Sequence, residues 1–146
     1  MKRIGSDTID LADALHSAAI HLLRRVRKED RASGIGPAQL SALSVLVFGG
    51  SMSLGDLAAA EQVKPPTMVR IVRSLGQQKL VNAHADQQDR RRITIDATAH
   101  GRQVMLRARR RRVQALAELI AGISEIEQEQ LRAAVKVMRQ LLTERR

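Results

Sequence analysis

The sequence predicts a mostly helical chain of the α+β class, with four helices, a two-stranded hairpin and two further helices in the order ααααββαα. Two observations support this order. Apolar residues recur at intervals of three and four in several segments, which is typical of helices with one buried face. Two strand-like runs, 80–85 and 92–96, flank the hydrophilic stretch DQQDRR, which favours a hairpin. The 146 residues suffice for one domain with its own core.

The first helix is expected to begin at Ser6 or Asp7, whose side chains can cap it, and to run to about Ala32. Its apolar stripe consists of Leu11, Leu15, Ala18, Leu22 and Val26. Pro37 suits the first position of a second helix, because proline lacks the N–H that this position leaves unbonded. This helix is expected to end at the glycine pair 49–50.

Capping patterns mark the third and fourth helices. Ser53, with Asp56 three residues later, forms a capping box for a short helix that ends near Ala60. The proline pair 65–66 is tolerated only in a first helical turn, so the fourth helix begins there and runs to about Lys79.

Two more helices follow the hairpin. Thr98 can cap a long fifth helix that ends near Gly122, a typical residue after a helix C-terminus. Ser124 and Glu127 form a second capping box. The sixth helix then carries an apolar face made of Leu131, Ala134, Val135, Met138 and Leu142.

The composition indicates a chain that binds an anion. The net charge is +10 and the isoelectric point about 11.4, so nucleic acid, an acidic protein or a membrane surface is the expected partner. Phe48 is the single aromatic residue, which argues against stacking on single-stranded nucleic acid. Among the modes of nucleic-acid binding, this leaves recognition of a double-stranded nucleic acid through its phosphates and groove edges.

Other classes of function lack their signatures in this sequence. The chain has no cysteine, which excludes disulfides, thiolate zinc sites and thiol-based redox sensing. Asp7 and Asp10 interrupt any signal-peptide pattern, and no apolar run approaches the roughly 20 residues of a membrane span. A cytoplasmic protein without a membrane partner is expected. No phosphate-binding loop or nucleophile elbow is present, so we expect neither an enzyme nor a cofactor.

The fourth helix has two unlike faces. Its apolar stripe is made of Met68, Ile71, Val72 and Leu75. The opposite side and its flank carry Pro66, Thr67, Arg70, Arg73, Ser74 and Gln77, with Lys64 just before the helix. A helix fits the major groove of B-DNA, where Arg can bond guanine, Gln can bond adenine, and Thr can touch a thymine methyl or a phosphate. The alternative is an ordinary solvated helix face.

Two neighbouring features favour the DNA interpretation. The short third helix lies about four residues before the fourth, which makes a helix-turn-helix plausible. Between residues 64 and 92, seven Lys and Arg residues stand against two Asp residues, a net charge of +5. At the hairpin turn, Arg90 and Arg91 can enter the minor groove, and Asp89 can hold the Arg91 guanidinium in one orientation. A solvated turn is the alternative.

These segments resemble the MarR family of multiple-antibiotic-resistance regulators. LGDLAAAEQVKPPTMVRIVRSLGQQKLV is similar to the family's helix-turn-helix, and DQQDRRRITIDATAHGR to its wing and the start of its linking helix, opened here by Thr98 and Gly101. The resemblance implies a winged helix-turn-helix with N- and C-terminal dimerisation helices. Within a single domain 1–146, the DNA-binding lobe would span 37–97, and the dimerisation region 7–32 and 98–146.

The resemblance also implies roles for named residues. The fourth helix would enter the major groove with Lys64, Pro66, Thr67, Arg70, Arg73 and Gln77. The wing would enter the minor groove with Asp89, Arg90 and Arg91. Two departures concern the framework. Asn82, Ala83 and His84 stand where the family often has Arg after its Leu-Val pair, and Glu61 with Gln62 occupies a turn that often contains Gly.

The histidines and the densest basic run receive lesser roles. His16 and His21 are five residues apart and do not share one helix face well, so no metal site is expected. The family suggests instead that they line an effector pocket for a phenolic or aromatic acid. The arginines of 107–112 spread around their helix, and we expect them to be solvated or paired with acids such as Glu118 and Glu125.

The sequence therefore predicts a double-stranded DNA-binding transcriptional regulator. The expected form is a ligand-responsive repressor that acts as a homodimer on a pseudo-palindromic operator, with half-sites about 10 bp apart. The alternative is a non-specific architectural DNA-binding or protein-interaction module. A footprint that survives competitor DNA separates the two.

Overall fold

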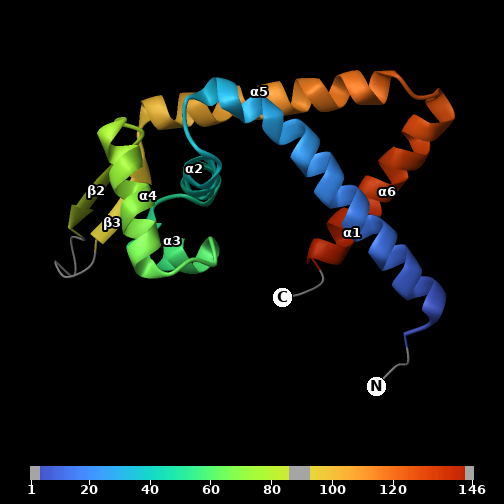
Figure 1. The fold of residues 1–146 in the computed structure, drawn as a ribbon, viewed down its shortest axis with the longest axis horizontal. Helices are drawn as coiled ribbons and strands as arrows, with labels where there is room; N and C mark the ends of the chain where they lie inside the picture. Colours follow the sequence, from blue (N-terminus) through green and yellow to red (C-terminus); the bar gives the residue numbers. More distant parts are fainter. Residues whose placement is uncertain (1–3, 86–92, 144–146) are drawn as a thin grey trace. The chain divides into compact units, whose positions relative to one another are not determined.

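A computed structural model describes residues 4–85 and 93–143 (Figure 1). Its elements confirm the predicted order of six α-helices and a hairpin, and add a 3-10 helix and a short strand. They are α1 (Ser6–Val26), η1 (Arg27–Ser33), α2 (Pro37–Gly49), β1 (Met52–Ser53), α3 (Leu54–Ala60), α4 (Pro65–Gln77), β2 (Val81–Ala85), β3 (Ile93–Ala97), α5 (Ala99–Ala121) and α6 (Glu125–Thr143).

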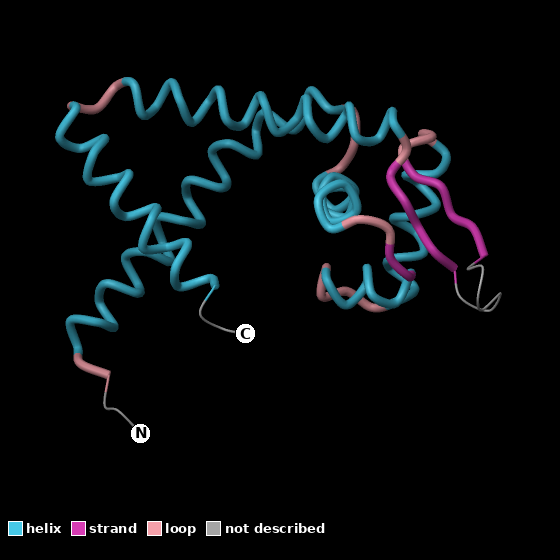
Figure 2. Tube along the Cα trace, turned by 180° about the vertical axis from the view of Figure 1, so that it is seen from behind, coloured by secondary structure: helices cyan, strands magenta, loops and turns pink. Residues whose placement is uncertain are grey.

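The strands form one antiparallel sheet in the order β1-β3-β2 (Figure 2). Val81 pairs with Ala97 at one end of the hairpin and Ala85 pairs with Ile93 at the other. Met52 pairs with Ile95, so β1 is a two-residue edge strand. Such a short strand is defined by its partner rather than by its own sequence, which explains why the sequence did not predict it.

The first helix differs from its predicted bounds. The α-helix ends at Val26, and the chain continues as the 3-10 helix η1. The hydroxyl of Ser33 donates to the carbonyl of Asp30 at 2.5 Å, which supports the tighter turn. The N-cap is Gly5 without a side-chain cap; the predicted cap at Ser6 or Asp7 is wrong, because Ser6 donates its hydroxyl to the Asp7 carboxylate instead.

The other predicted caps are confirmed by their hydrogen bonds. The Ser53 hydroxyl accepts from the amide of Asp56 at 3.1 Å. The Ser124 hydroxyl accepts from the amide of Glu127, and the Glu127 carboxylate accepts from Ser124, which lowers the pKa of this exposed carboxyl. The fourth helix ends at Gln77, two residues before the predicted Lys79, which adopts a left-handed φ of 57°.

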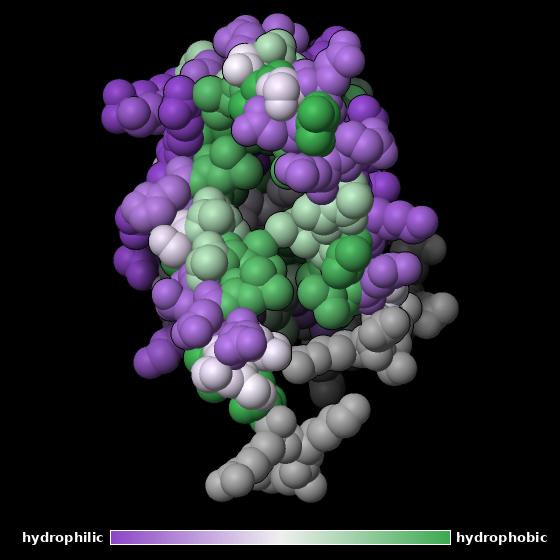
Figure 3. Space-filling model, turned by 90° about the vertical axis from the view of Figure 1, so that its right-hand side faces the viewer, coloured by the Kyte–Doolittle hydropathy of each residue, from purple (hydrophilic) through white to green (hydrophobic). Residues whose placement is uncertain are grey.

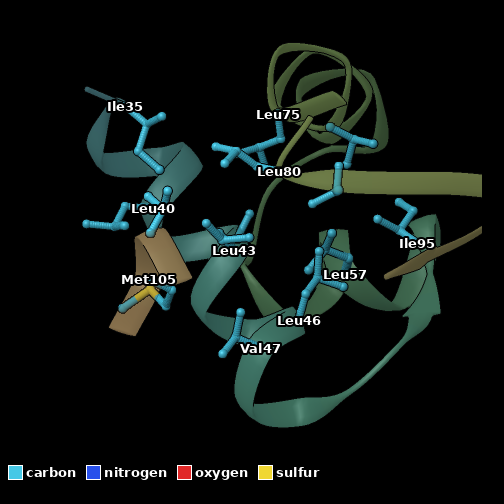
Figure 4. Close-up of a cluster of buried hydrophobic side chains, with 14 of the residues drawn as sticks. Ile35, Leu40, Leu43, Leu46, Val47, Leu57, Leu75, Leu80, Ile95 and Met105 are labelled. Carbon is cyan, nitrogen blue, oxygen red and sulfur yellow. The ribbon is translucent and has the colours of Figure 1, made fainter. Parts of the chain in front are cut away.

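The core lies in the segment that holds the helix-turn-helix and the sheet. Side chains from α2, α3, α4, β3 and α5 point toward one another (Figure 4). The largest fully buried side chains are Leu40, Leu43, Leu46, Leu57, Met68, Leu75 and Ile95. This core orients α4, because the apolar face of that helix has to be covered.

The start of α5 is hydrogen-bonded directly to the turn between α4 and β2. Thr98 donates its amide to the carbonyl of Leu80 at 3.0 Å and its hydroxyl to the carbonyl of Lys79 at 2.8 Å. The same hydroxyl accepts from the amide of Gly101 at 2.9 Å, which confirms Thr98 as the cap. A Cβ at Gly101 would lie 2.0 Å from the Leu80 carbonyl oxygen, so only glycine permits this approach.

The chain divides into two compact units between Arg112 and Val113. The second unit holds the end of α5 and all of α6, a helix without a buried residue in its described part. In the described chain, no single helix has the length and apolar composition of a membrane span. The segments Ser6–Ser33 and Pro37–Gly49 reach that threshold only together, as a pair bent by 90°.

Replacing Gly101 by Ala is expected to lower the free energy of unfolding by about 3 kcal/mol or more, because a backbone carbonyl occupies the space of the new methyl. Gly76→Ala in α4 is the matched control. No atom lies within 4 Å of a Cβ there, so that variant should be as stable as wild type or more stable by up to about 1 kcal/mol. Denaturant unfolding measures both; equal stability of the two variants would contradict the close approach.

Candidate nucleic-acid interface

The helix-turn-helix is built from α3 and α4, which pack together and on α2 (Figure 1). In the connecting turn the amide of Val63 donates to the carbonyl of Ala58 at 3.0 Å. Gln62 adopts a left-handed φ of 53°, a conformation that favours glycine. The absence of Gly from this turn is therefore accommodated by a Gln in the same kind of conformation.

The buried face of α4 is as the helical wheel predicts. Met68, Val72 and Leu75 are buried, and Ile71 is half-buried against the core. Because these residues are spaced three and four apart, their burial leaves the opposite face of the helix outward. Pro65 and Pro66 fill the first turn, where their missing N–H groups cost no helical hydrogen bond.

The outward face carries the residues that we predicted for the major groove. Lys64, Pro66, Arg70, Arg73 and Gln77 are all exposed. Within residues 4–85 and 93–143, no carboxylate lies at ion-pair distance from the cations of this face. An external anion would therefore meet these guanidinium groups without competition from any described carboxylate.

One flank of α4 is turned toward α2. The Ser74 hydroxyl accepts from Gln39 Nε2 at 2.6 Å, and Gln39 Oε1 in turn accepts from the amide of Gly36 at 2.5 Å. Thr67 lies on this flank and is half-buried. Ser74 therefore has a structural partner, and the exposed surface for a ligand is centred on Arg70, Arg73 and their neighbours.

The hairpin is braced by a polar cluster that the sequence analysis did not single out. Asp96 on β3 accepts from Asn82 Nδ2 at 3.2 Å, and its other oxygen lies 3.3 Å from His84 Nδ1. Asn82 and His84 stand where the family often has Arg. In this protein both residues contact the carboxylate of Asp96 on the neighbouring strand, which supports the hairpin. Asp89, Arg90 and Arg91 lie outside the described residues, and their roles stay predictions.

Comparison with known proteins decides the family. A family model described as MarR family matches residues 33–92. HTH-type transcriptional regulators from Mycobacterium tuberculosis and Mycobacterium bovis are each 34% identical to this chain over 134 residues, covering 92% of it and 94% of the relative. The chain belongs to the MarR family.

Solved structures agree with this assignment in fold. A putative transcriptional regulator from Pseudomonas aeruginosa has a TM-score of 0.80 at 27% identity, with 96% of this chain and 99% of that chain covered. A MarR family protein from Bacillus stearothermophilus has a TM-score of 0.81 at 21% identity, with 97% and 99% covered. The mostly helical winged helix-turn-helix architecture of this MarR protein is therefore shown.

Neither His16 nor His21 is among the residues that line the cavities of about 850 Å³ and about 90 Å³ in the described part of the chain. His16 and His21 are both exposed on α1. The cavity of about 90 Å³ is lined by residues that include Asp30, Ser41 and Arg112, and by neither histidine. Among the described residues no group of three His, Cys, Asp or Glu side chains could hold a metal ion. The effector role of the two histidines stays a prediction.

In the dense basic run Arg107, Arg109 and Arg110 are exposed, as expected, whereas Arg111 and Arg112 have partners that we did not expect. Arg112 forms a bidentate ion pair with the buried Asp30. Its Nε donates to Oδ1 and its Nη2 donates to Oδ2, both at 2.6 Å. Arg111 donates to the carbonyl of Glu29 at 3.4 Å. Glu118, one of the expected acids, accepts from Gln114 instead. Asp30 is 82 residues away from Arg112, so nothing local in the sequence signals the pair.

Arg112→Ala is expected to lower the free energy of unfolding by about 2–4 kcal/mol, since it leaves the Asp30 carboxylate buried without a partner. The estimate allows for the 28% exposure of the Arg112 side chain. Arg110→Ala, at an exposed position of the same run, should change stability by less than about 0.5 kcal/mol. Thermal or urea unfolding compares them. Equal effects would mean that the bidentate pair does not form.

Proposed function

We propose that this MarR protein is a homodimeric, sequence-specific repressor that binds a pseudo-palindromic DNA duplex and releases it in response to a small organic effector. One observation carries the DNA-binding part of this proposal. The outward face of α4 presents Lys64, Arg70, Arg73 and Gln77 without acid partners among the described residues, while the opposite face is locked in the core. Such a helix can enter a major groove with its cations toward base edges and phosphates.

The role of α4 is supported by a related fold with DNA. The solved structure of a mutant of MepR from Staphylococcus aureus, bound to an oligodeoxyribonucleotide, has a TM-score of 0.69 over 91% of this chain and 98% of that chain. At 23% identity it supports the fold rather than any single contact. In our proposal Asp89, Arg90 and Arg91 add a minor-groove contact from the wing.

Uncovered apolar surface supports the homodimer. On α6, Leu131, Val135 and Met138 are between 37% and 39% exposed, and Leu142 is 84% exposed. The second unit also holds an open groove of about 850 Å³, lined in part by Ile120, Leu131 and Val135. Figure 3 shows hydrophobic side chains gathered between hydrophilic ones on one face of the molecule.

Apolar surface of this extent is costly to leave in water, and a second copy of the chain is the partner that we propose for it. On α1, Ile9, Leu11 and Leu22 are also exposed, and a second copy of the chain is the partner that we propose for them too. Two-fold symmetry would then place two α4 helices on half-sites about 10 bp apart. The effector response rests on the family relationship, with a phenolic or aromatic acid as the expected class.

The competing function is non-specific DNA binding through charge alone, which the exposed arginines Arg107, Arg109 and Arg110 on α5 would favour. The two functions differ in which arginines matter. Sequence-specific binding depends on α4, whereas charge-driven binding responds to any exposed cation and falls steeply with salt.

Arg70→Ala and Arg73→Ala are expected to weaken binding to a specific duplex by about 5- to 150-fold and to relax its base preference, because a bidentate base contact is lost. Arg110→Ala should weaken specific and random duplexes alike, by a small factor. Gel-shift titration at fixed salt, with excess competitor DNA, measures all three. Equal losses from α4 and α5 would favour the charge-driven alternative.

Sedimentation of the wild type should give twice the chain mass of 16.1 kDa.

A further inference from the structure

Val69 is the apolar residue of α4 that the core does not cover. It is 39% exposed, whereas Met68 and Leu75 on the buried face are fully covered. By helical spacing it follows Pro66 by three residues and precedes Arg73 by four, so it shares the outward surface with both. Thr67 lies on the other flank, toward α2.

An exposed apolar side chain alone has no functional meaning, because such residues are common on protein surfaces. The position of Val69 in the helix and its charged neighbours favour a role in DNA binding. It lies in the first half of a recognition helix, the part that reaches base edges in helix-turn-helix proteins. It is also flanked by cations that the proposed function brings to DNA. A β-branched residue is slightly unfavourable at an exposed helix position, so local helix stability does not explain its presence there.

We propose that Val69 reads the C5-methyl group of a thymine in the major groove, next to the guanine read by Arg73. The thymine methyl is the apolar feature of the major-groove edge, and it is matched by an apolar side chain. This inference rests on the proposed function and adds an element of the operator sequence to it. The contact with the thymine methyl is thereby assigned to Val69. The sequence alone suggested Thr67 for this contact.

The spacing of the two side chains limits where the thymine lies. Residues four apart on a helix have Cβ atoms about 5–6 Å from each other. Successive base pairs are about 3.4 Å apart along the duplex. The thymine should therefore lie within about two base pairs of the guanine that Arg73 contacts. Burial of one methyl group corresponds to about a fourfold change in affinity.

The test uses full-length wild-type protein and a duplex selected by it from a random library. Each thymine of the selected duplex is replaced in turn by deoxyuridine, which lacks only the C5-methyl group. Affinities are measured for wild type, Val69→Ala and Thr67→Ala. Because Val69 is exposed, the first variant should unfold at the same denaturant concentration as wild type.

We expect one thymine per half-site at which deoxyuridine weakens wild-type binding about fourfold. The same replacement should weaken binding by Thr67→Ala equally and leave binding by Val69→Ala unchanged. This thymine should lie within about two base pairs of the guanine whose replacement no longer matters in Arg73→Ala.

Three results overturn the inference while leaving sequence-specific binding intact. They are the lack of any methyl-sensitive thymine, equal methyl sensitivity in Val69→Ala and wild type, and loss of that sensitivity in Thr67→Ala instead. Failure to select any sequence over random duplex would remove the proposed function itself, and the inference with it.

Discussion

Burial of one face of α4 is the constraint on which the arrangement of this protein depends. Met68 and Leu75 are completely covered, and the helix can cover them only by turning Arg70 and Arg73 outward. The hydrophobic effect thereby fixes the direction of charged side chains on the opposite face of the same helix. The orientation of the outward face of α4 is thus a consequence of packing.

Hydrogen bonds connect the segment that follows α4 to the start of α5. Two consecutive carbonyls, those of Lys79 and Leu80, accept hydrogen bonds from Thr98 at the start of α5. Gly101 lets the first turn of α5 approach the Leu80 carbonyl without a Cβ between them. Near the end of the same unit, Arg112 holds α5 to the buried Asp30 of η1. The part of α5 that belongs to the first compact unit is therefore fixed at both of its ends.

Features that depend on neighbours in the sequence were predictable. The Ser53 and Ser124 capping boxes, the Thr98 cap and the apolar stripe of α4 each follow from residues three or four apart, and the structure confirms them. The wheel also separated the exposed arginines from the buried stripe. Recognition of the family came from the same segment, because its helix-turn-helix and wing patterns are local.

Features that depend on distant partners were not predictable. The edge strand β1 and the Asp30–Arg112 pair depend on contacts made far along the chain, and the 3-10 helix η1 contains Glu29 and Asp30, which accept hydrogen bonds from α5. In the sequence Asp96 is an ordinary residue at the end of a predicted strand. Its contacts with Asn82 and His84 are set by the pairing of β2 with β3. Likewise, the spacing of α4 puts Val69 beside the buried stripe, and only the folded structure shows that the core leaves it 39% exposed.

We propose that DNA lies against the outward face of α4 rather than against the basic run of α5. Because the chain contains no cysteine, Gln77→Cys and Arg110→Cys can each carry a photoactivatable cross-linker at one defined position. On a selected duplex, we predict cross-links from position 77 to bases of the major groove and none from position 110. Cross-links from position 110 with none from position 77 would contradict this account of the protein.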